Sequence, residues 1–301
     1  MLPDWLTQPR LPFAAVPAAR RVRLFDTEYA ALDLGAAGRL YVTRHGWPVL
    51  ESLLPESWYV GRYFARHGKR MTLATGCVYY VRGRGGRRPP ELLVKFSRVG
   101  QDVPVWIAPD LSLHVSEHDL VNARFVGPFE EFGLCEEMRR GTFGPPQIHL
   151  RVKRPLAIYT PPNVFQPWQM GRSDARFAHS LLLQHDDPSR GGAEVPLDIH
   201  RDYILLYGWV AGDHAQSFYE SGALSEEQFA GLVPHAMRTL AAKGFRMLDM
   251  KPAHLILRRR RRDRSFLRRD GRLAYVVVDY ELVVRTPAYE LARRARPPGT
   301  A

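Results

Sequence analysis

Long apolar runs are missing from this chain of 301 residues. No stretch reaches the ~18 consecutive apolar residues that a membrane-spanning helix needs. The first residues, MLPDWLTQPRLPF, have no basic segment followed by an apolar one, so they predict no secretory signal. Only two cysteines occur, Cys77 and Cys135. They have no metal-binding spacing and suit a reducing compartment, which makes the cytoplasm the expected location.

Lysine is scarce as well, since 38 of the 43 basic residues are Arg and only 5 are Lys. The net charge of +12 favours anionic partners such as a nucleotide, a nucleic acid or a phospholipid surface. We attribute the arginine excess to genome composition more than to function. Lys95 and Lys251 are therefore informative, because Lys fills only about one in nine of the basic positions.

The composition, with 45% hydrophobic and 25% charged residues, is typical of a globular chain. Its length suits one large domain or two lobes. Residues 224–243 predict a helix that begins at the capping box Ser225-Glu-Glu-Gln228 and ends at Gly244. A second helix is expected over residues 127–140, where Phe129, Phe132, Cys135 and Met138 share a face. Strands are expected at residues 39–43, 58–64, 71–82, 91–98, 202–212, 255–257 and 273–278. One or two further strands are expected over residues 147–159, with a break around Pro155 that separates 149–152 from 156–159. The mixture predicts the α+β class.

Two segments carry most of the chemistry. The first, Gly244–Leu257, reads GFRMLDMKPAHLIL and contains Asp249, Lys251 and His254. The second, Leu273–Glu281, is an apolar strand that ends in Asp279. Phosphoryl transfer needs a carboxylate for the attacking hydroxyl, a cation for the transferred phosphate and hard ligands for Mg2+. Residues of these types are present here, and the resemblance described next implies that reaction.

The pattern resembles the catalytic loop and metal-binding Asp of the protein-kinase-like phosphotransferases. It matches at Asp249, Lys251, Pro252 and the apolar run that follows, and it departs at His254, where the commonest kinases have Asn. A His at this place is similar to the bacterial lipopolysaccharide core sugar kinases of the same superfamily. The resemblance implies Asp249 and Lys251 as catalytic residues. It implies a metal site of His254, Asp279 and, as a helper, Glu281.

The same resemblance implies a nucleotide site in the preceding strands. Lys95, in Val94-Lys95-Phe96, would contact the nucleotide phosphates and pair with a Glu of the helix 127–140, for which Glu131 is expected, with Glu130 next. No Gly-x-Gly-x-x-Gly loop is present. Gly68 and Lys69, in a turn expected between the strands 58–64 and 71–82, could supply part of its role.

The strand 202–212 would end in the hinge between two lobes, around residues 207–212. The resemblance implies that hinge backbone groups, at Tyr207 and Trp209, would meet the adenine. The expected organisation is an N-terminal extension (1–38), a β-rich N-lobe (39–208) and a small truncated helical C-lobe (209–301). The N-lobe would include an insertion, residues 160–201, with one helix at 174–184. The length of this insertion favours a functional role. Because only 22 residues follow Asp279, we expect no room for the later helices of a protein-kinase C-lobe, and thus a small molecule, glycan or lipid as acceptor.

Residues 258–272 hold nine Arg in fifteen positions and predict a basic hairpin. It could contact an acidic membrane surface, or lie near Asp249 and Asp279 and favour an acidic acceptor. It could equally be a solvated turn.

The leading hypothesis is an ATP-dependent phosphotransferase that uses ATP and Mg2+ and acts on a hydroxyl of a small-molecule, glycan or lipid-linked acceptor. A degenerate pseudokinase that binds a nucleotide or a partner is the first alternative. A basic nucleic-acid-binding protein ranks last, because no basic platform interleaved with aromatic residues is evident.

Overall fold

The computed structural model describes residues 11–71, 76–84, 89–99, 101–102, 116, 119, 123–170, 172 and 197–295. The chain forms two compact units. Unit 1 comprises residues 1–101, 125–133 and 154–209, and unit 2 comprises residues 102–124, 134–153 and 210–301. The helix predicted over residues 127–140 is α6 (Pro128–Arg140), which contributes residues to both units.

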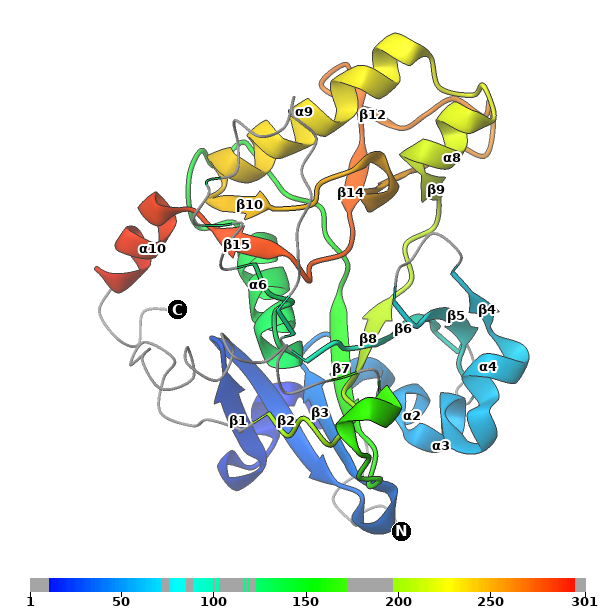
Figure 1. The fold of residues 1–301 in the computed structure, drawn as a ribbon, viewed down its shortest axis with the longest axis vertical. Coiled ribbons are helices and arrows are strands. Elements are labelled where there is room, and N and C mark those ends of the chain that lie inside the picture. Colours follow the sequence, from blue (N-terminus) through cyan, green and yellow to red (C-terminus); the bar gives the residue numbers. More distant parts are fainter. Residues whose placement is uncertain are drawn as a thin grey trace. The chain divides into compact units, whose positions relative to one another are not determined.

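Unit 1 is built on an eight-stranded antiparallel sheet with the order β1-β2-β3-β7-β8-β6-β5-β4 (Figure 1). Its strands are β1 (Arg21–Leu24), β2 (Thr27–Asp33), β3 (Arg39–Thr43), β4 (Lys69–Arg70), β5 (Val78–Arg82), β6 (Glu91–Phe96), β7 (Pro155–Thr160) and β8 (Ile204–Gly208). Strands β7 and β8 lie in the middle of the order, and all their residues are buried apart from Gly208. Two almost fully buried strands therefore form the centre of this sheet.

The sheet extends beyond the residues that were expected to form it. Strand β1 pairs with β2, and β2 pairs with β3, so residues 21–33 of the N-terminal extension form two strands of the sheet. The strand expected at residues 58–64 was wrong. That region consists of short helices: α2 (Leu50–Leu53), α3 (Pro55–Trp58), η5 (Val60–Arg62) and α4 (Tyr63–His67). Its aromatic residues pack one face of the sheet from a helix, because Trp58 and Phe64 belong to the core cluster of Leu40, Val94 and Ile204.

Unit 2 combines helices with short antiparallel ladders. Helix α9 (Glu226–Ala242) begins at the predicted capping box, in which Ser225 and Gln228 bond each other's backbone N–H groups. It packs against β10 (Phe245–Met247), which pairs with β15 (Val283–Arg285). A second ladder has the order β14-β11-β9, formed by Tyr275–Val277, Leu255–Leu257 and Asp213–His214. Helices α8 (Ala215–Glu220) and α10 (Pro287–Arg294) complete the unit.

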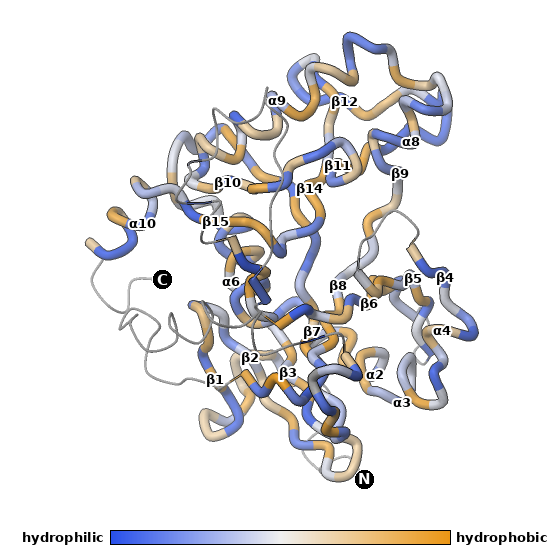
Figure 2. Tube along the Cα trace, in the orientation of Figure 1, coloured by the Kyte–Doolittle hydropathy of each residue, from blue (hydrophilic) through white to orange (hydrophobic). Residues whose placement is uncertain are grey.

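The α+β class is confirmed, and the β-rich make-up of unit 1 is consistent with a kinase-like N-lobe. In Figure 2 the strands of both units carry hydrophobic, orange segments, in keeping with their burial. The helix expected at residues 174–184 lies outside the described residues, as does most of the insertion 160–201.

Candidate active site

Unit 1 holds a buried ion pair between strand β6 and helix α6. Lys95 lies between β5 and β8, paired with Val78 on one side and Leu205 on the other. Its Nζ is 2.9 Å from Glu131 Oε1, and the side chains are only 8% and 1% exposed. Burying two charges is favourable only when each is matched by the other and by further hydrogen bonds. The sequence named Glu131 as the expected partner of Lys95, ahead of Glu130.

Tyr207 supplies one of those further hydrogen bonds. Its hydroxyl donates to the same Glu131 Oε1 at 2.7 Å, and its ring lies 5.0 Å from that of Phe132. The side chain is 1% exposed. The adenine contact expected at Tyr207 involves its backbone, whereas its side chain orients the carboxylate that pairs with Lys95. Glu131 Oε2 is buried without a hydrogen-bond partner among the described residues.

Trp209 also makes contacts within unit 1. Its indole packs edge-on against Tyr80, with ring centroids 4.8 Å apart. Its backbone N–H donates to the carbonyl of Glu91 at 2.9 Å, so this N–H is not available to an adenine.

Gly68 and Lys69 do not form a turn between two strands. Helix α4 ends just before them, and Lys69 belongs to β4, where it pairs with Tyr80. A Cβ at Gly68 would lie 2.2 Å from the carbonyl oxygen of Phe64, so the glycine allows a close backbone approach. The connection between β4 and β5 is residues 71–77, of which 72–75 lie outside the described residues.

Unit 2 holds the catalytic-loop residues between two ladders. Leu248, just after β10, donates its N–H to the carbonyl of Leu282, just before β15, at 2.9 Å. At the other end Val278 donates its N–H to the carbonyl of His254, also at 2.9 Å. The two loops, 249–253 and 279–281, are therefore closed against each other at both ends. This pairing explains why two motifs thirty residues apart in the sequence meet.

The side chains converge within this enclosure. His254 Nε2 lies 3.6 Å from Asp279 Oδ2 and 3.9 Å from Asp249 Oδ2. Lys251 Nζ lies 3.6 Å from Asp249 Oδ2 and is 44% exposed. His254 is buried, whereas both Asp side chains remain partly exposed. The loop thus presents two carboxylates and an ammonium group to solvent on either side of a buried imidazole.

The segment after β14 has an unusual backbone conformation. Asp279 has a φ of +69°, in the left-handed region that Asp tolerates better than most residues. Tyr280 ties the segment down, since its hydroxyl donates to the carbonyl of Val277 at 2.6 Å and accepts from the N–H of Lys153 at 2.7 Å. Glu281, expected as a helper at the metal, is buried.

His214 supports the loop that carries His254, and the sequence analysis did not identify it. It lies on β9, where it pairs with Ile256, and its Nδ1 is hydrogen-bonded to the carbonyl of Ala253, one residue before His254. Burial lowers the pKa of His214 below its ordinary value, and the nearby charge of Lys153 lowers it further. A neutral imidazole that donates from Nδ1 suits this contact. The partner lies 39 residues away along the chain, so no local spacing could have indicated it.

The donor set fits Mg2+ only in part. Mg2+ prefers oxygen ligands and is usually bound by one or two carboxylates together with substrate phosphates. Asp279 and Asp249 provide such oxygens, whereas the imidazole of His254 is a softer ligand. No cluster of three His, Cys, Asp or Glu side chains that could hold a metal ion is found among the described residues.

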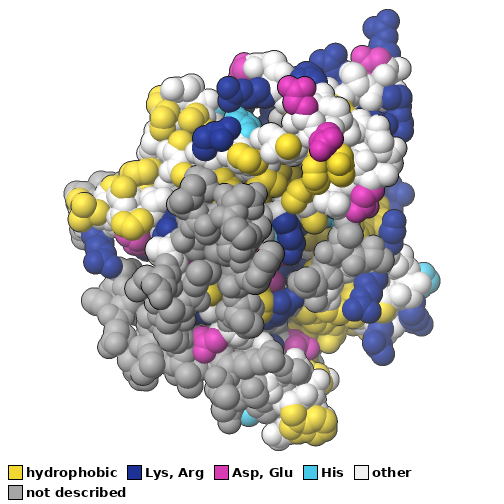
Figure 3. Space-filling model, turned by 45° about the horizontal axis from the view of Figure 1, so that its top comes forward, with side chains coloured by type: hydrophobic (Ala, Val, Ile, Leu, Met, Phe, Trp, Pro, Cys, Tyr) yellow, Lys and Arg dark blue, Asp and Glu magenta, His cyan; other side chains and the backbone are white. Residues whose placement is uncertain are grey.

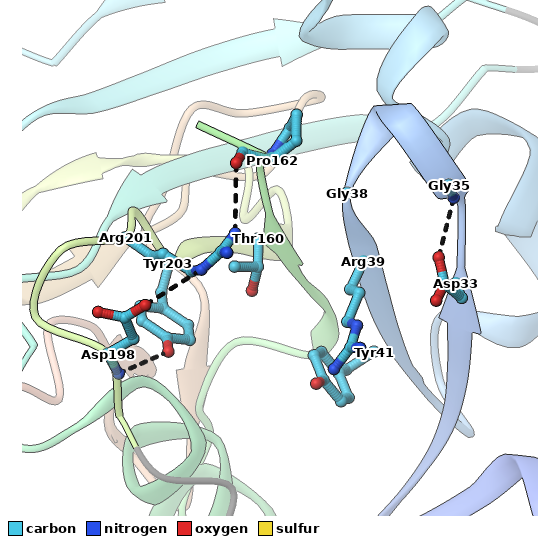
Figure 4. A pocket seen from close by; sticks show the side chains of 10 residues that line it. All are labelled: Asp33, Gly35, Gly38, Arg39, Tyr41, Thr160, Pro162, Asp198, Arg201 and Tyr203. Atoms are coloured by element: carbon cyan, nitrogen blue, oxygen red, sulfur yellow. Dashed lines mark hydrogen bonds and ion pairs between the residues drawn. The ribbon is translucent and has the colours of Figure 1, made fainter. Parts of the chain in front are cut away.

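A separate cavity of about 470 Å³ lies in unit 1, at the end of β2, β3 and β7 (Figure 4). Arg201 there donates from Nε to Asp198 at 3.1 Å. None of the expected nucleotide-site residues lines it; the lining residues are Asp33, Gly35, Gly38, Arg39, Tyr41, Thr160, Pro162, Asp198, Arg201 and Tyr203. The structure does not join this cavity to the ion pair of Lys95.

No family model and no curated protein matches this chain. Among solved structures it is similar to WaaP in complex with acyl carrier protein, at 12% identity and a TM-score of 0.35, over 77% of this chain and 71% of that one. It is also similar to WbdD in complex with the kinase inhibitor LY294002, at 14% identity and a TM-score of 0.29, over 72% of this chain. The chain spans 34% of that WbdD chain. At such low identities and TM-scores the likeness assigns no function, which has to come from the residues.

Proposed function

We propose that the protein is an ATP-dependent phosphotransferase of the kinase type that acts on a hydroxyl of a small molecule, a glycan or a lipid-linked acceptor. The observation that carries the proposal is the enclosure in unit 2, where Asp249 and Asp279 lie within 3.9 Å of one imidazole nitrogen of His254. Phosphoryl transfer depends on positioning and charge neutralisation, and this loop offers both.

Each side chain of the loop has a proposed role. Asp249 accepts the proton of the acceptor hydroxyl and orients its oxygen. Lys251, whose side chain is 44% exposed, neutralises the transferred phosphate. Asp279 would hold Mg2+ together with the nucleotide phosphates, and the bound ion would supply further charge neutralisation there. His254 lies between the two carboxylates and keeps them apart at fixed positions.

Lys95 is the proposed contact for the nucleotide phosphates in unit 1. Its pairing with Glu131 fixes the position of the ammonium group, which is the arrangement that kinase chemistry asks of this pair. Tyr207 contributes by fixing Glu131. We do not assign an adenine contact to the side chain of Tyr207 or to the N–H of Trp209, because both are already hydrogen-bonded.

A pseudokinase that binds a nucleotide without turnover is the second candidate. One observation favours it: the buried His254 contacts both carboxylates, where an amide side chain would offer the oxygen ligand that Mg2+ prefers. Binding of ATP would then persist while transfer failed.

Thermal unfolding in the presence of ATP, with and without Mg2+, tests the proposal. A ligand at a hundred times its Kd should stabilise the protein by about 2.7 kcal/mol. The variant Asp279→Asn should lose the part of the shift that depends on Mg2+. Asp270→Asn is the matched control, because Asp270 lies in the same unit with a φ of +50° and a side chain that is 91% exposed.

The variant Asp249→Asn separates the two candidates. A kinase should bind ATP with this variant but hydrolyse or transfer phosphate at least about a hundredfold more slowly, because the general base is lost. Equal and very low turnover in the wild type and in Asp249→Asn, with a normal ATP shift in both, would favour the pseudokinase. The absence of any ATP shift in the wild type would contradict both candidates.

A further inference from the structure

The arginine hairpin, residues 258–272, is a folded element of unit 2. Beyond β11 and β14 the chain doubles back twice. The N–H of Arg260 donates to the carbonyl of Ser265 at 2.7 Å, and the N–H of Leu267 donates to the carbonyl of Arg258 at 2.8 Å. The N–H of Ala274 then donates to the carbonyl of Leu267 at 2.8 Å. The result is a small antiparallel meander with a backbone defined by hydrogen bonds.

Two turns shape the meander. Strands β12 (Arg268–Arg269) and β13 (Arg272–Leu273) are joined by Asp270 and Gly271, both with positive φ, as a two-residue hairpin turn requires. In the other turn Asp263 accepts hydrogen bonds from the N–H and hydroxyl of Ser265. The hairpin is therefore built by its own local chemistry.

The hairpin is strongly positive. Eight of its nine arginines are exposed, at positions 258, 260, 261, 262, 264, 268, 269 and 272. Only two acidic residues accompany them. Asp263 is engaged by Ser265, and Asp270 lies 3.7 Å from the side chain of Arg269. Figure 3 shows Lys and Arg side chains, in dark blue, along the upper right edge of the face that it draws.

The base of the hairpin is anchored by aromatic packing. Phe266 packs edge-on against Phe218 of helix α8, with centroids 5.0 Å apart. The guanidinium of the ninth arginine, Arg259, lies 4.9 Å from each of these two rings, within the range of a cation–π contact. This packing occupies the hairpin's one aromatic side chain and leaves the remaining guanidinium groups toward solvent.

We propose that the arginine hairpin binds the surface of an anionic lipid bilayer. A bilayer surface offers many phosphates over a wide area, which suits eight exposed guanidinium groups spread over two turns. Single-stranded nucleic acid is a poorer fit, because it needs aromatic faces for base stacking and Phe266 is already packed. The contact inserts no large apolar side chain, so it is reversible and weakens with salt.

The hairpin lies close to the candidate active site of unit 2, so a membrane contact there would affect the choice of acceptor. His254 and Asp279 flank one end of the pair β11 and β14, and the hairpin leaves from the other end. Three residues of strand separate them, or about 10 Å. The hairpin is therefore not part of the loop that holds Asp249, but it would keep that loop close to a membrane surface. A hairpin bound to a membrane would favour a lipid-linked acceptor. That inference about the acceptor rests on the proposed function, whereas the membrane binding itself does not.

The experiment is co-sedimentation of the full chain with vesicles of neutral phosphatidylcholine, alone or with about a third of anionic phosphatidylglycerol. We expect binding to the anionic vesicles only, weakening as salt is raised. Substitution of Arg260, Arg261, Arg262 and Arg264 by Gln should lower the partition coefficient by about tenfold or more. The same four positions changed to Lys should retain most of the binding, since the charge is kept.

The matched control removes four exposed arginines from unit 1, at positions 23, 39, 44 and 66, with the same change in net charge. It should bind anionic vesicles within about twofold of the wild type. Equal losses in the two Gln variants would show that net charge alone drives binding and would overturn the proposal. So would binding to neutral vesicles, or binding of a single-stranded oligonucleotide that vesicles cannot displace. The ATP-dependent thermal shift should be unchanged in all variants, so failure here is distinct from failure of the proposed function.

Discussion

The stability of unit 1 depends on both members of the buried ion pair between Lys95 and Glu131. Each charge is almost fully removed from water, and each is compensated by the other at 2.9 Å. We predict that Lys95→Met lowers the free energy of unfolding by about 3–5 kcal/mol, because it leaves the Glu131 carboxylate buried and uncompensated. Urea unfolding followed by tryptophan fluorescence measures this change.

The double variant Lys95→Met/Glu131→Gln separates stability from function. Removing both charges should recover most of the lost stability, because no buried charge remains. ATP binding should not recover, since the ammonium group that would meet the phosphates is gone. Full recovery of the ATP-dependent thermal shift would show that Lys95 has only a structural role.

His214 makes stability depend on pH. Its pKa is lowered by burial below the ordinary value of 6.5, so the unfolded chain binds a proton more readily than the folded chain does. The contribution to stability is therefore complete above about pH 6.5 and is lost as the pH falls through the lower pKa of the folded state. We expect His214→Gln to weaken this pH dependence in unfolding experiments from pH 7.5 to 5. An unchanged profile would mean that other groups, such as His235, whose pKa is also lowered chiefly by burial, dominate.

At the scale of elements, Tyr280 holds the loop that carries Asp279. Its hydroxyl joins the carbonyl of Val277 to the N–H of Lys153, two groups from separate segments of unit 2. Tyr280→Phe keeps the ring and should cost about 1–3 kcal/mol of stability, because the buried carbonyl of Val277 and the partly buried N–H of Lys153 both lose their partner. If the loop positions Asp279 for Mg2+, the Mg2+-dependent part of the ATP shift should fall as well. A loss of stability with an intact Mg2+ effect would limit Tyr280 to a structural role.

Helix α9 begins at Ser225, whose side chain accepts from the N–H of Gln228. The helix leads through Gly244 into β10 and the catalytic loop. Ser225→Ala should lower the free energy of unfolding by about 1 kcal/mol, and Ser225→Gly by only a few tenths, because glycine is itself tolerated at a helix start. Equal costs for the two variants would show that the side-chain hydrogen bond is not what stabilises this end.

At the scale of the whole molecule, the two cysteines differ in exposure, so their reaction rates with a thiol reagent measure opening of the fold. Cys77 is exposed, whereas Cys135 is buried in helix α6. A thiol reagent should modify one cysteine per native chain quickly, and the second only on a timescale set by opening of α6. The rate of the second reaction should rise with urea. Rapid modification of both cysteines in the native protein, with Cys77→Ser as the reference, would contradict the placement of α6.

No helix among the described residues is long and apolar enough to cross a membrane. The contact proposed for the arginine hairpin acts through charge, so its occupancy should follow ionic strength. Since the chain carries a net charge of +12, comparisons of variants are meaningful only at matched charge and salt.

Signals within a few residues determined much of this protein. The capping box at Ser225 and the helix α6 with its apolar face of Phe129, Phe132, Cys135 and Met138 are each encoded by neighbouring residues, and each was found where its pattern indicated. The motif residues of the catalytic loop could be named for the same reason, because their order along the chain reflects the chemistry that the resemblance implies. These features need only local backbone geometry and side-chain type.

Tertiary structure decided the rest, because it depends on partners that are distant in the sequence. Tyr207 could have faced a nucleotide or the core, and the buried carboxylate of Glu131 decided in favour of the core. Trp58 sits in an aromatic run that fits a strand, yet it packs the sheet from a helix. The carbonyl of Ala253 is matched by a histidine 39 residues away. A hydrogen bond or a packing contact between distant segments has no spacing in the sequence, so only the folded chain shows which of several suitable partners is used.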